Sequence, residues 1–93
     1  MKIMAVCGSG LGSSFMLEMN IIEMLKEMNV SGVEVEHADL GSASRDMADI
    51  FVAGRDIAEG AGHLGDVVVL NNILDKNELK TKIMAALAEK GVL

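Results

Sequence analysis

Short apolar runs, separated by longer amphipathic stretches, constrain the fold of this chain more than any other feature. Residues 2–7 and 66–70 are nearly continuous apolar runs, and residues 50–53 form a shorter one. Such runs are typical of strands buried on both faces, as in parallel sheets. Residues 33–36 instead alternate valine and glutamate, which is typical of an edge strand with one face in water. The sequence therefore predicts four strands.

Helical patterns lie between these strands. The clearest runs from residue 14 to residue 28, where apolar side chains mostly recur at helical spacings. Asp56 and Glu59 stand in the N-cap and N3 relation of a capping box, so we expect a second helix to begin at Asp56. Residues 44–47 predict a short helical turn.

The last helix is predicted by Asp75 and Glu78, which have the same N-cap and N3 spacing. Its buried stripe is expected to consist of Leu79, Ile83 and Leu87. Strands and helices thus alternate along the whole chain, and alternation of this kind predicts a parallel sheet.

The chain length suits one small domain, because 93 residues, about half of them apolar, can enclose one core. We therefore expect a single three-layer α/β domain over residues 1–93. Its four-stranded parallel sheet should have the strand order 2-1-3-4, with helices on both faces. In such sheets ligands bind at the carboxyl ends of the strands, where the strand order reverses. This point lies between the first and third strands.

Composition excludes several classes of function. The formal charge is −6, the eight Lys and Arg residues are scattered, and the only aromatic residues are two Phe, so nucleic-acid binding is disfavoured. The single cysteine cannot form an intrachain disulfide, and the N-terminus does not resemble a signal peptide. No apolar run approaches the ~20 residues needed to span a bilayer. We expect a cytoplasmic protein without direct membrane insertion.

Residues 7–14 join the first strand to the first helix and carry the strongest chemical signal. They read Cys7-Gly8-Ser9-Gly10-Leu11-Gly12-Ser13-Ser14. Glycines allow successive backbone N–H groups to turn toward an anion, and serines add hydroxyl donors. The helix that begins here directs its unpaired N–H groups and the positive end of its dipole at the same point. The segment therefore predicts a phosphate-binding loop.

Cys7 stands at the mouth of this loop, in an environment that favours the thiolate, the nucleophilic form of cysteine. Attack of the thiolate on a phosphoryl donor would give a phosphocysteine held by the loop. A lone cysteine at a strand end is more often a small buried hydrophobe. A glycine-rich loop can likewise be only a tight turn. The combination of thiol, loop and helix favours the chemical interpretation.

This motif resembles that of the enzyme IIB components of the sugar phosphotransferase system (PTS), particularly the ascorbate-type and sugar-alcohol (galactitol)-type branch. The resemblance extends over the whole chain and implies a Rossmann-like fold with a phosphatase-type loop. It also implies that Cys7 is the phosphorylated residue and that residues 8–14 bind the phosphate. In that family a phosphohistidine on a IIA component supplies the phosphoryl group, and a sugar bound by a membrane IIC component receives it.

Two other classes compete with this interpretation. Low-molecular-weight tyrosine phosphatases and arsenate reductases share the strand, cysteine loop and helix. Their loop has an arginine six residues after the cysteine, where this chain has Ser13, and the chain has no proline for their acidic Asp-Pro pair. A nucleotide-binding module is the second alternative. Residues 60–65 spell G-x-G-x-x-G, but they precede a predicted strand instead of following one.

A few polar and aromatic residues outside the loop are further candidates. Arg55 and Asn71 follow the third and fourth strands, so both should lie on the loop's side of the sheet and could contact phosphate or a partner; solvated loop positions are the alternative. Phe15 is a candidate partner contact. His37 and His63 make no recognisable metal-ligand spacing with the cysteine. We expect no metal and no cofactor.

Overall fold

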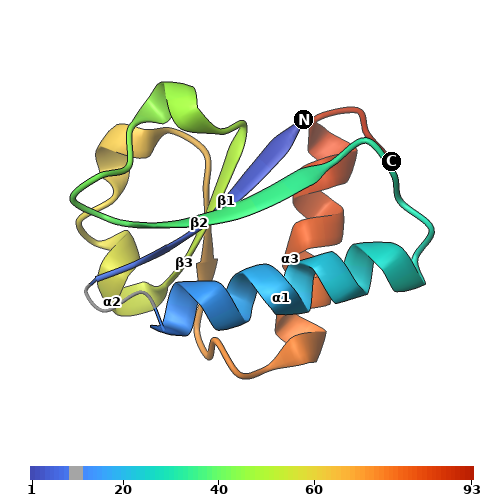
Figure 1. Cartoon of the computed structure of the whole chain (residues 1–93), viewed down its shortest axis with the longest axis horizontal. Helices are drawn as coiled ribbons and strands as arrows, with labels where there is room; N and C mark the ends of the chain where they lie inside the picture. The colour runs from blue at the N-terminus through green and yellow to red at the C-terminus, as the bar shows by residue number, and fades with distance from the viewer. Residues whose placement is uncertain (9–11) are drawn as a thin grey trace.

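The computed structural model describes residues 1–8 and 12–93, which form a sheet flanked by helices (Figure 1). In chain order, the strands are β1 (Lys2–Cys7), β2 (Glu34–Asp39), β3 (Ile50–Gly54) and β4 (Val67–Leu70). The helices are α1 (Gly12–Glu27), α2 (Arg55–Ala58) and α3 (Lys76–Glu89), and the 3-10 turns are η1 (Arg45–Met47) and η2 (Gly62–Leu64).

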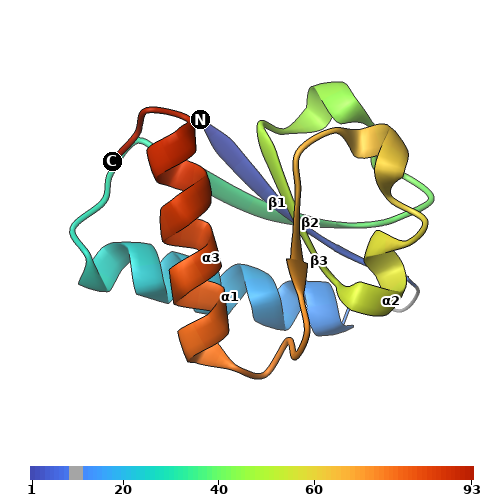
Figure 2. The same cartoon turned by 180° about the vertical axis from the view of Figure 1, so that it is seen from behind.

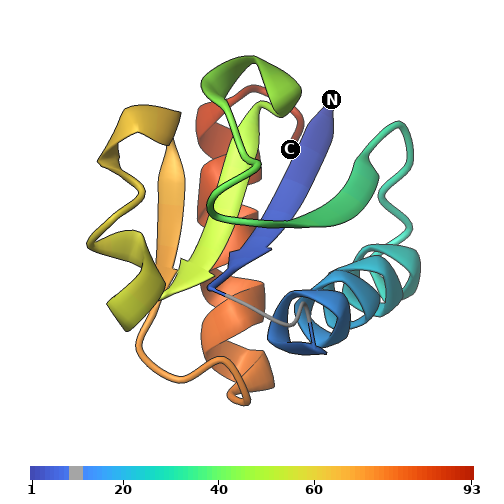
Figure 3. The same cartoon turned by 60° about the vertical axis from the view of Figure 1, so that its left-hand side comes forward.

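The strands form one parallel sheet in the order β2-β1-β3-β4, which confirms the predicted topology. Because every pair is parallel, all four strands end at the same edge, and Figure 3 shows the strands side by side with α3 behind them. β1 is central and pairs with β2 on one side and β3 on the other. The strand order reverses between β1 and β3, beside the glycine-rich loop that follows β1 in the sequence.

The two faces of the sheet are covered differently. Ile3 and Ala5 of β1 belong to a large apolar cluster formed with α1 and α3. Met4 and Val6, at the alternate positions, belong to a smaller cluster packed under the short turns η1, α2 and η2. Figure 1 shows the short turns on the left of the sheet and α1 and α3 on its right, and Figure 2 shows the same arrangement from behind. The prediction of helices on both faces is confirmed, with one face covered only by single turns.

β2 is longer than the alternating pattern indicated. The sequence predicted a strand over residues 33–36, whereas the observed strand is Glu34–Asp39. Its length follows β1, with which it pairs from Lys2 opposite Glu34 to Cys7 opposite Asp39. Pairing with a neighbour therefore extends the strand through polar residues whose own pattern gives no strand signal.

The predicted capping box of α2 is wrong. The helix begins at Arg55, its N-cap is Gly54 without a side-chain hydrogen bond, and Glu59 is already its C-cap. The chain turns directly from the end of β3 into a single helical turn. Asp56 is therefore free of a capping role and lies inside the turn. α1 differs less, since it begins at Gly12, two residues before the predicted start.

α3 begins as predicted but uses its two acidic residues differently. The Asp75 side chain caps the helix by accepting hydrogen bonds from the backbone N–H groups of Asn77 and Glu78. The Glu78 carboxylate does not complete a capping box and reaches instead to the loop that follows β4. The predicted stripe is confirmed, because the side chains of its three members are all buried: Leu79, Ile83 and Leu87.

Candidate functional site

Cys7 is the last residue of β1, at the edge of the sheet where the parallel strands end. Its backbone carbonyl accepts a hydrogen bond of 2.8 Å from the Leu40 N–H, just after β2. Only 5% of the residue is exposed. Along β1 it shares a face with Ala5 and Ile3, two and four residues before it, so its side chain lies on the side of the sheet that faces α1. The end of the strand therefore positions the thiol beside the first turn of α1.

Ser14 is the polar residue that meets the thiol. Its hydroxyl oxygen lies 3.0 Å from Cys7 Sγ in a buried hydrogen bond, and Ser14 itself is fully buried in the first turn of α1. A hydroxyl can accept from a thiol or donate to a thiolate, because it has one donor and two acceptor sites. Ser14 can therefore satisfy the sulfur in both protonation states.

The N-terminus of α1 adds a favourable field for an anion. The helix is 16 residues long and its first turn contains no acidic side chain. Backbone N–H groups at a helix start have no partner within the helix, and the dipole places partial positive charge there. An anion on Cys7 would face these donors without repulsion from a carboxylate in that first turn. That this environment holds a phosphate stays a prediction.

A pocket of about 250 Å³ opens onto the thiol, and we call it the Cys7 pocket. Its described lining residues are Val6, Cys7, Gly8, Leu17, Gly54, Asp56, Ile57 and Ile73. A Cβ at Gly8 would come within 3.1 Å of Ile57 Cδ1, so a larger residue there would press on the isoleucine that forms part of the wall. The walls are mostly apolar, and Asp56 contributes the carboxylate. A small group can therefore reach an otherwise buried sulfur.

A second pocket of about 500 Å³ adjoins the first, and we call it the Arg55 pocket. The two pockets have three lining residues in common, Gly54, Asp56 and Ile73. Arg55 and Asn71 both line the Arg55 pocket. The structure therefore brings these two residues together beside the Cys7 pocket, as expected from their positions after β3 and β4.

The loop that carries Asn71 is held by Glu78. The Glu78 carboxylate accepts hydrogen bonds from the N–H groups of Asn71 at 2.8 Å and Asn72 at 3.0 Å. Lys82 Nζ bonds the same carboxylate at 2.8 Å and the Val69 carbonyl at 2.6 Å. The hydrogen bond from Lys82, followed by those from the two backbone N–H groups, lowers the pKa of Glu78 to about 2. The side of the Arg55 pocket formed by this loop is thereby pinned to α3.

Phe15 lies outside both pockets, at the surface beside the start of α1. It is 53% exposed, and its ring makes an edge contact with His37 at a centroid distance of 5.6 Å. His37 Nδ1 in turn lies 2.6 Å from Glu18 Oε1. A large apolar side chain that is exposed yet held in place suits contact with another protein.

Four predicted loop residues cannot be placed in this geometry. Ser9, Gly10 and Leu11 lie outside the described residues, and so does the side chain of Ser13. Their role in holding phosphate stays a prediction.

Sequence reasoning gave no site role to six residues that line the Cys7 pocket: Val6, Leu17, Gly54, Asp56, Ile57 and Ile73. Asp56 was assigned to a helix cap, and the two isoleucines had no assigned role. The signal that could have found Asp56 and Ile73 is the one that found Arg55 and Asn71, namely a position shortly after a buried parallel strand.

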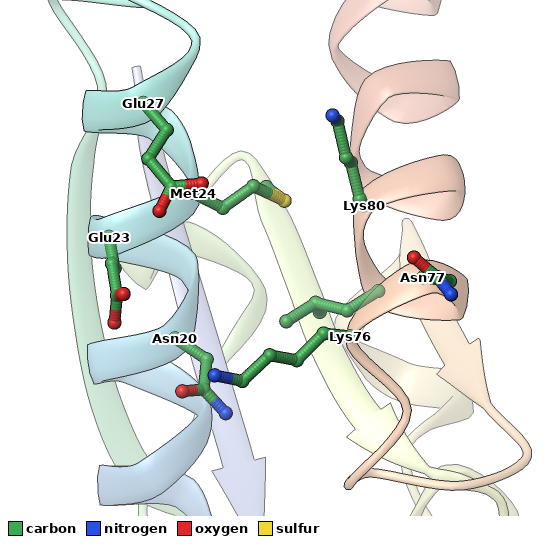
Figure 4. A pocket seen from close by; sticks show the side chains of 8 residues that line it. Asn20, Glu23, Met24, Glu27, Lys76, Asn77 and Lys80 are labelled. Carbon is green, nitrogen blue, oxygen red and sulfur yellow. The ribbon is translucent and has the colours of Figure 1, made fainter.

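A separate groove lies between α1 and α3 and shares no lining residue with the Cys7 pocket. Figure 4 shows Glu23 and Glu27 on α1 across from Lys76 and Lys80 on α3, with Met24 pointing between them. The groove has about 250 Å³ of space, and its described lining includes no cysteine, serine, threonine or histidine.

Within residues 1–8 and 12–93, no three His, Cys, Asp or Glu side chains are grouped so as to hold a metal ion. Over the same part of the chain, no helix is both long and apolar enough to cross a membrane.

Comparison with known proteins agrees with this geometry. A family model described as "PTS system, Lactose/Cellobiose specific IIB subunit" matches residues 2–87. The chain belongs to the PTS IIB family. Among curated proteins, the "Ascorbate-specific PTS system EIIB component" of Salmonella typhimurium (strain LT2) is 29% identical over 92 residues, which is 95% of this chain and 90% of that protein. The protein of the same name from Escherichia coli O157:H7 has the same identity and coverage.

Membership of the IIB family decides between the functions that the sequence left open. This IIB protein is a phosphocarrier of a sugar phosphotransferase system, and hence a phosphotransferase. Neither a tyrosine phosphatase nor a nucleotide-binding module is favoured, in keeping with serine at position 13 where those phosphatases have arginine. IIB components work with IIA and IIC components, so the family also indicates the general kind of partner.

Proposed function

We propose that Cys7 is the residue that carries the phosphoryl group. The observation that supports this most is the position of the chain's single thiol, buried at the end of β1 within 3.0 Å of Ser14 at the start of α1. A thiol, a helix N-terminus and an access pocket meet at this point. The loop over residues 8–14 then binds the phosphoryl oxygens. This proposal includes the loop residues that lie outside the described part of the chain.

The transfer proceeds in two displacements at phosphorus. The Cys7 thiolate attacks the phosphohistidine of a IIA partner, so that the S–P bond forms, the N–P bond breaks and the departing imidazole takes up a proton. A hydroxyl of the sugar held by a IIC partner then attacks the phosphocysteine. The O–P bond forms, the S–P bond breaks, the hydroxyl releases its proton and the thiolate returns. Backbone donors aimed at the oxygens stabilise charge in both steps.

The acceptor that we propose is ascorbate or a related polyol. The relatives at 29% identity are named as ascorbate-specific components, whereas the matching family model is described by lactose and cellobiose. The similarity to named proteins over nearly the whole chain favours the first class. We also propose that residues 1–93 act as one IIB domain in the cytoplasm, where a IIA partner could reach Cys7.

Phosphorylation and mapping test the assignment of Cys7. The protein is incubated with purified general phosphotransferase proteins and candidate IIA proteins, and its intact mass and peptides are then measured. We expect one added phosphoryl group, mapped to Cys7, that persists when no acceptor is present. Cys7→Ser should fold normally and remain unmodified.

His37→Gln and His63→Gln are the matched controls and should still be phosphorylated. A phosphoryl group mapped to either histidine, or full transfer by Cys7→Ser, would refute the role of Cys7.

A further inference from the structure

The Arg55 pocket has a mixed polar lining that the carrier role of Cys7 does not use. Its polar members are Arg55, Asp56, Glu59, Asn71 and Asn72, and its apolar members include Leu70 and Ile73. Guanidinium and amide groups supply donors, while carboxylate and amide oxygens supply acceptors. The side chains of Arg55 and Asn71 make no hydrogen bond or ion pair with any other described residue, so both are open to a ligand.

The position of this pocket links it to the reacting sulfur. Gly54, at the end of β3, lines both pockets, and a Cβ on it would come within 3.2 Å of Asp56 Oδ1 and of Ile73 Cγ2. The absence of a side chain on Gly54 therefore leaves room between Asp56 and Ile73, the other two residues that line both pockets. A molecule lying in the Arg55 pocket can extend one end toward Cys7.

The pocket is also organised before any ligand arrives. Glu78 holds the N–H groups of Asn71 and Asn72, and the Asn72 side-chain oxygen accepts a hydrogen bond of 2.9 Å from the Leu74 N–H. These bonds fix the backbone of the loop and leave the Asn71 amide for another partner. A fixed loop lowers the entropy cost of ordering side chains around a ligand.

The chemistry of the lining selects one class of ligand. The carboxylates of Asp56 and Glu59 disfavour an anionic group in this pocket in addition to the phosphoryl group at Cys7. The described lining of the pocket also includes no aromatic ring on which a base or a sugar ring could stack. Closely spaced donors and acceptors over an apolar floor suit a neutral carbon chain with several hydroxyl groups. Such a chain corresponds to the polyol part of the acceptor class proposed above.

We propose that the Arg55 pocket is a subsite for the hydroxyl-bearing chain of the acceptor, with Arg55 and Asn71 as its main contacts. The subsite rests on the proposed function, because the end of the chain nearest Cys7 is the hydroxyl that receives the phosphoryl group. The IIB protein then contributes to the choice of acceptor as well as carrying the phosphate.

Binding of the reaction product tests the subsite without any phosphorylation of Cys7. Amide shifts of the intact protein are followed by NMR during titration with inorganic phosphate and, separately, with the terminal phosphate ester of sorbitol. We expect the sorbitol ester to bind about tenfold more tightly than inorganic phosphate, the gain typical of a few modest hydrogen bonds. Its additional shifts should fall on Gly54, Arg55 and Asn71.

Arg55→Gln and Asn71→Ala should each remove most of the difference in affinity between the sorbitol ester and inorganic phosphate. Arg45→Gln is the matched control, since Arg45 is an exposed arginine in η1 and lines neither pocket; it should retain the full tenfold difference. Equal affinities for the two ligands, or extra shifts confined to Phe15 and its neighbours, would overturn the subsite. Because Cys7 stays unmodified here, failure of the subsite and failure of the phosphocysteine assignment are separate results.

Discussion

The hydroxyl of Ser14 provides the buried sulfur of Cys7 with a hydrogen-bond partner. A buried polar side chain costs stability unless it is hydrogen-bonded, and a buried sulfur that must become an anion needs a donor. The Ser14 hydroxyl is fully buried and lies 3.0 Å from Cys7 Sγ, so it meets both requirements. In the proposed transfer, the serine thus donates to the Cys7 thiolate from the first turn of α1, where the helix N-terminus also favours negative charge.

Ser14→Ala should therefore slow phosphoryl transfer to Cys7. Loss of one hydrogen bond to a charged group is worth about 1.5–3 kcal/mol, so we expect a decrease in rate of about tenfold or more. The measurement is the initial rate of phosphorylation by the cognate IIA protein, followed by intact mass. Ser31→Ala, at an exposed position, is the control and should leave the rate unchanged. A Ser14→Ala protein as fast as the original would exclude this role.

α3 owes its position relative to the site to Glu78 as well as to its buried stripe. The Glu78 carboxylate bonds two backbone N–H groups of the loop after β4, and Lys82 bonds both the carboxylate and the end of β4. The helix is therefore tied to the strand by charged hydrogen bonds at the edge that carries both pockets. Asp75 caps the helix independently, so the two acidic residues have separate tasks.

Protonation of Glu78 at low pH should weaken its hydrogen bonds to the loop after β4 and to Lys82. The pKa of Glu78 is lowered from 4.5 to about 2, so its contribution to stability is present above pH 4.5 and is lost as the pH falls toward 2. Glu78→Gln should consequently lower the urea midpoint of unfolding at neutral pH. The difference in urea midpoint between the original protein and Glu78→Gln should become smaller as the pH falls from 4.5 to 2.

The control for this measurement is Glu27→Gln, an exposed glutamate of α1 that forms no ion pair with another described residue. Its urea midpoint should follow that of the original protein at every pH. If Glu78→Gln had the same urea midpoint as the original protein at neutral pH, the hydrogen bonds of the Glu78 carboxylate would add nothing to stability.

The two faces of the sheet carry apolar clusters of different size. The larger apolar cluster lies between the sheet and the helices α1 and α3, and the smaller cluster lies under three short turns. Hydrophobic burial increases with the apolar area removed from water, so the α1 and α3 side supplies most of the stability. The opposite side, with its single turns, brings loop residues close to the thiol.

Ile83→Ala should test how much α3 contributes. Ile83 is fully buried in the larger cluster, and truncation of such a side chain typically costs about 2–5 kcal/mol. Small domains have only about 5–15 kcal/mol of stability in total, so the urea midpoint should fall sharply. Met84→Ala, the adjacent and exposed position, should change stability by less than about 0.5 kcal/mol. Equal effects of the two substitutions would show that α3 does not carry the core.

Local patterns explain why much of the fold could be predicted. Continuous valine-rich runs are read directly from the sequence as buried strands, and Asp75 caps α3 because capping involves neighbours along the chain. Asp56 shows the limit of this reasoning. It has the spacing of a cap, yet the chain enters α2 at Arg55 and leaves it by Glu59, so the side chain lines a pocket instead.

The sequence by itself determined the four strands, their parallel order, and the position of Cys7 at the start of a glycine- and serine-rich loop, because these depend on periodicity and on connections along the chain. Only the tertiary structure decided the length of β2, the contact between Cys7 and Ser14, and the joining of Arg55 and Asn71 in one pocket. These features arise between residues far apart in sequence or from the exact path of a turn. Packing sets them, and no local pattern records how distant segments meet.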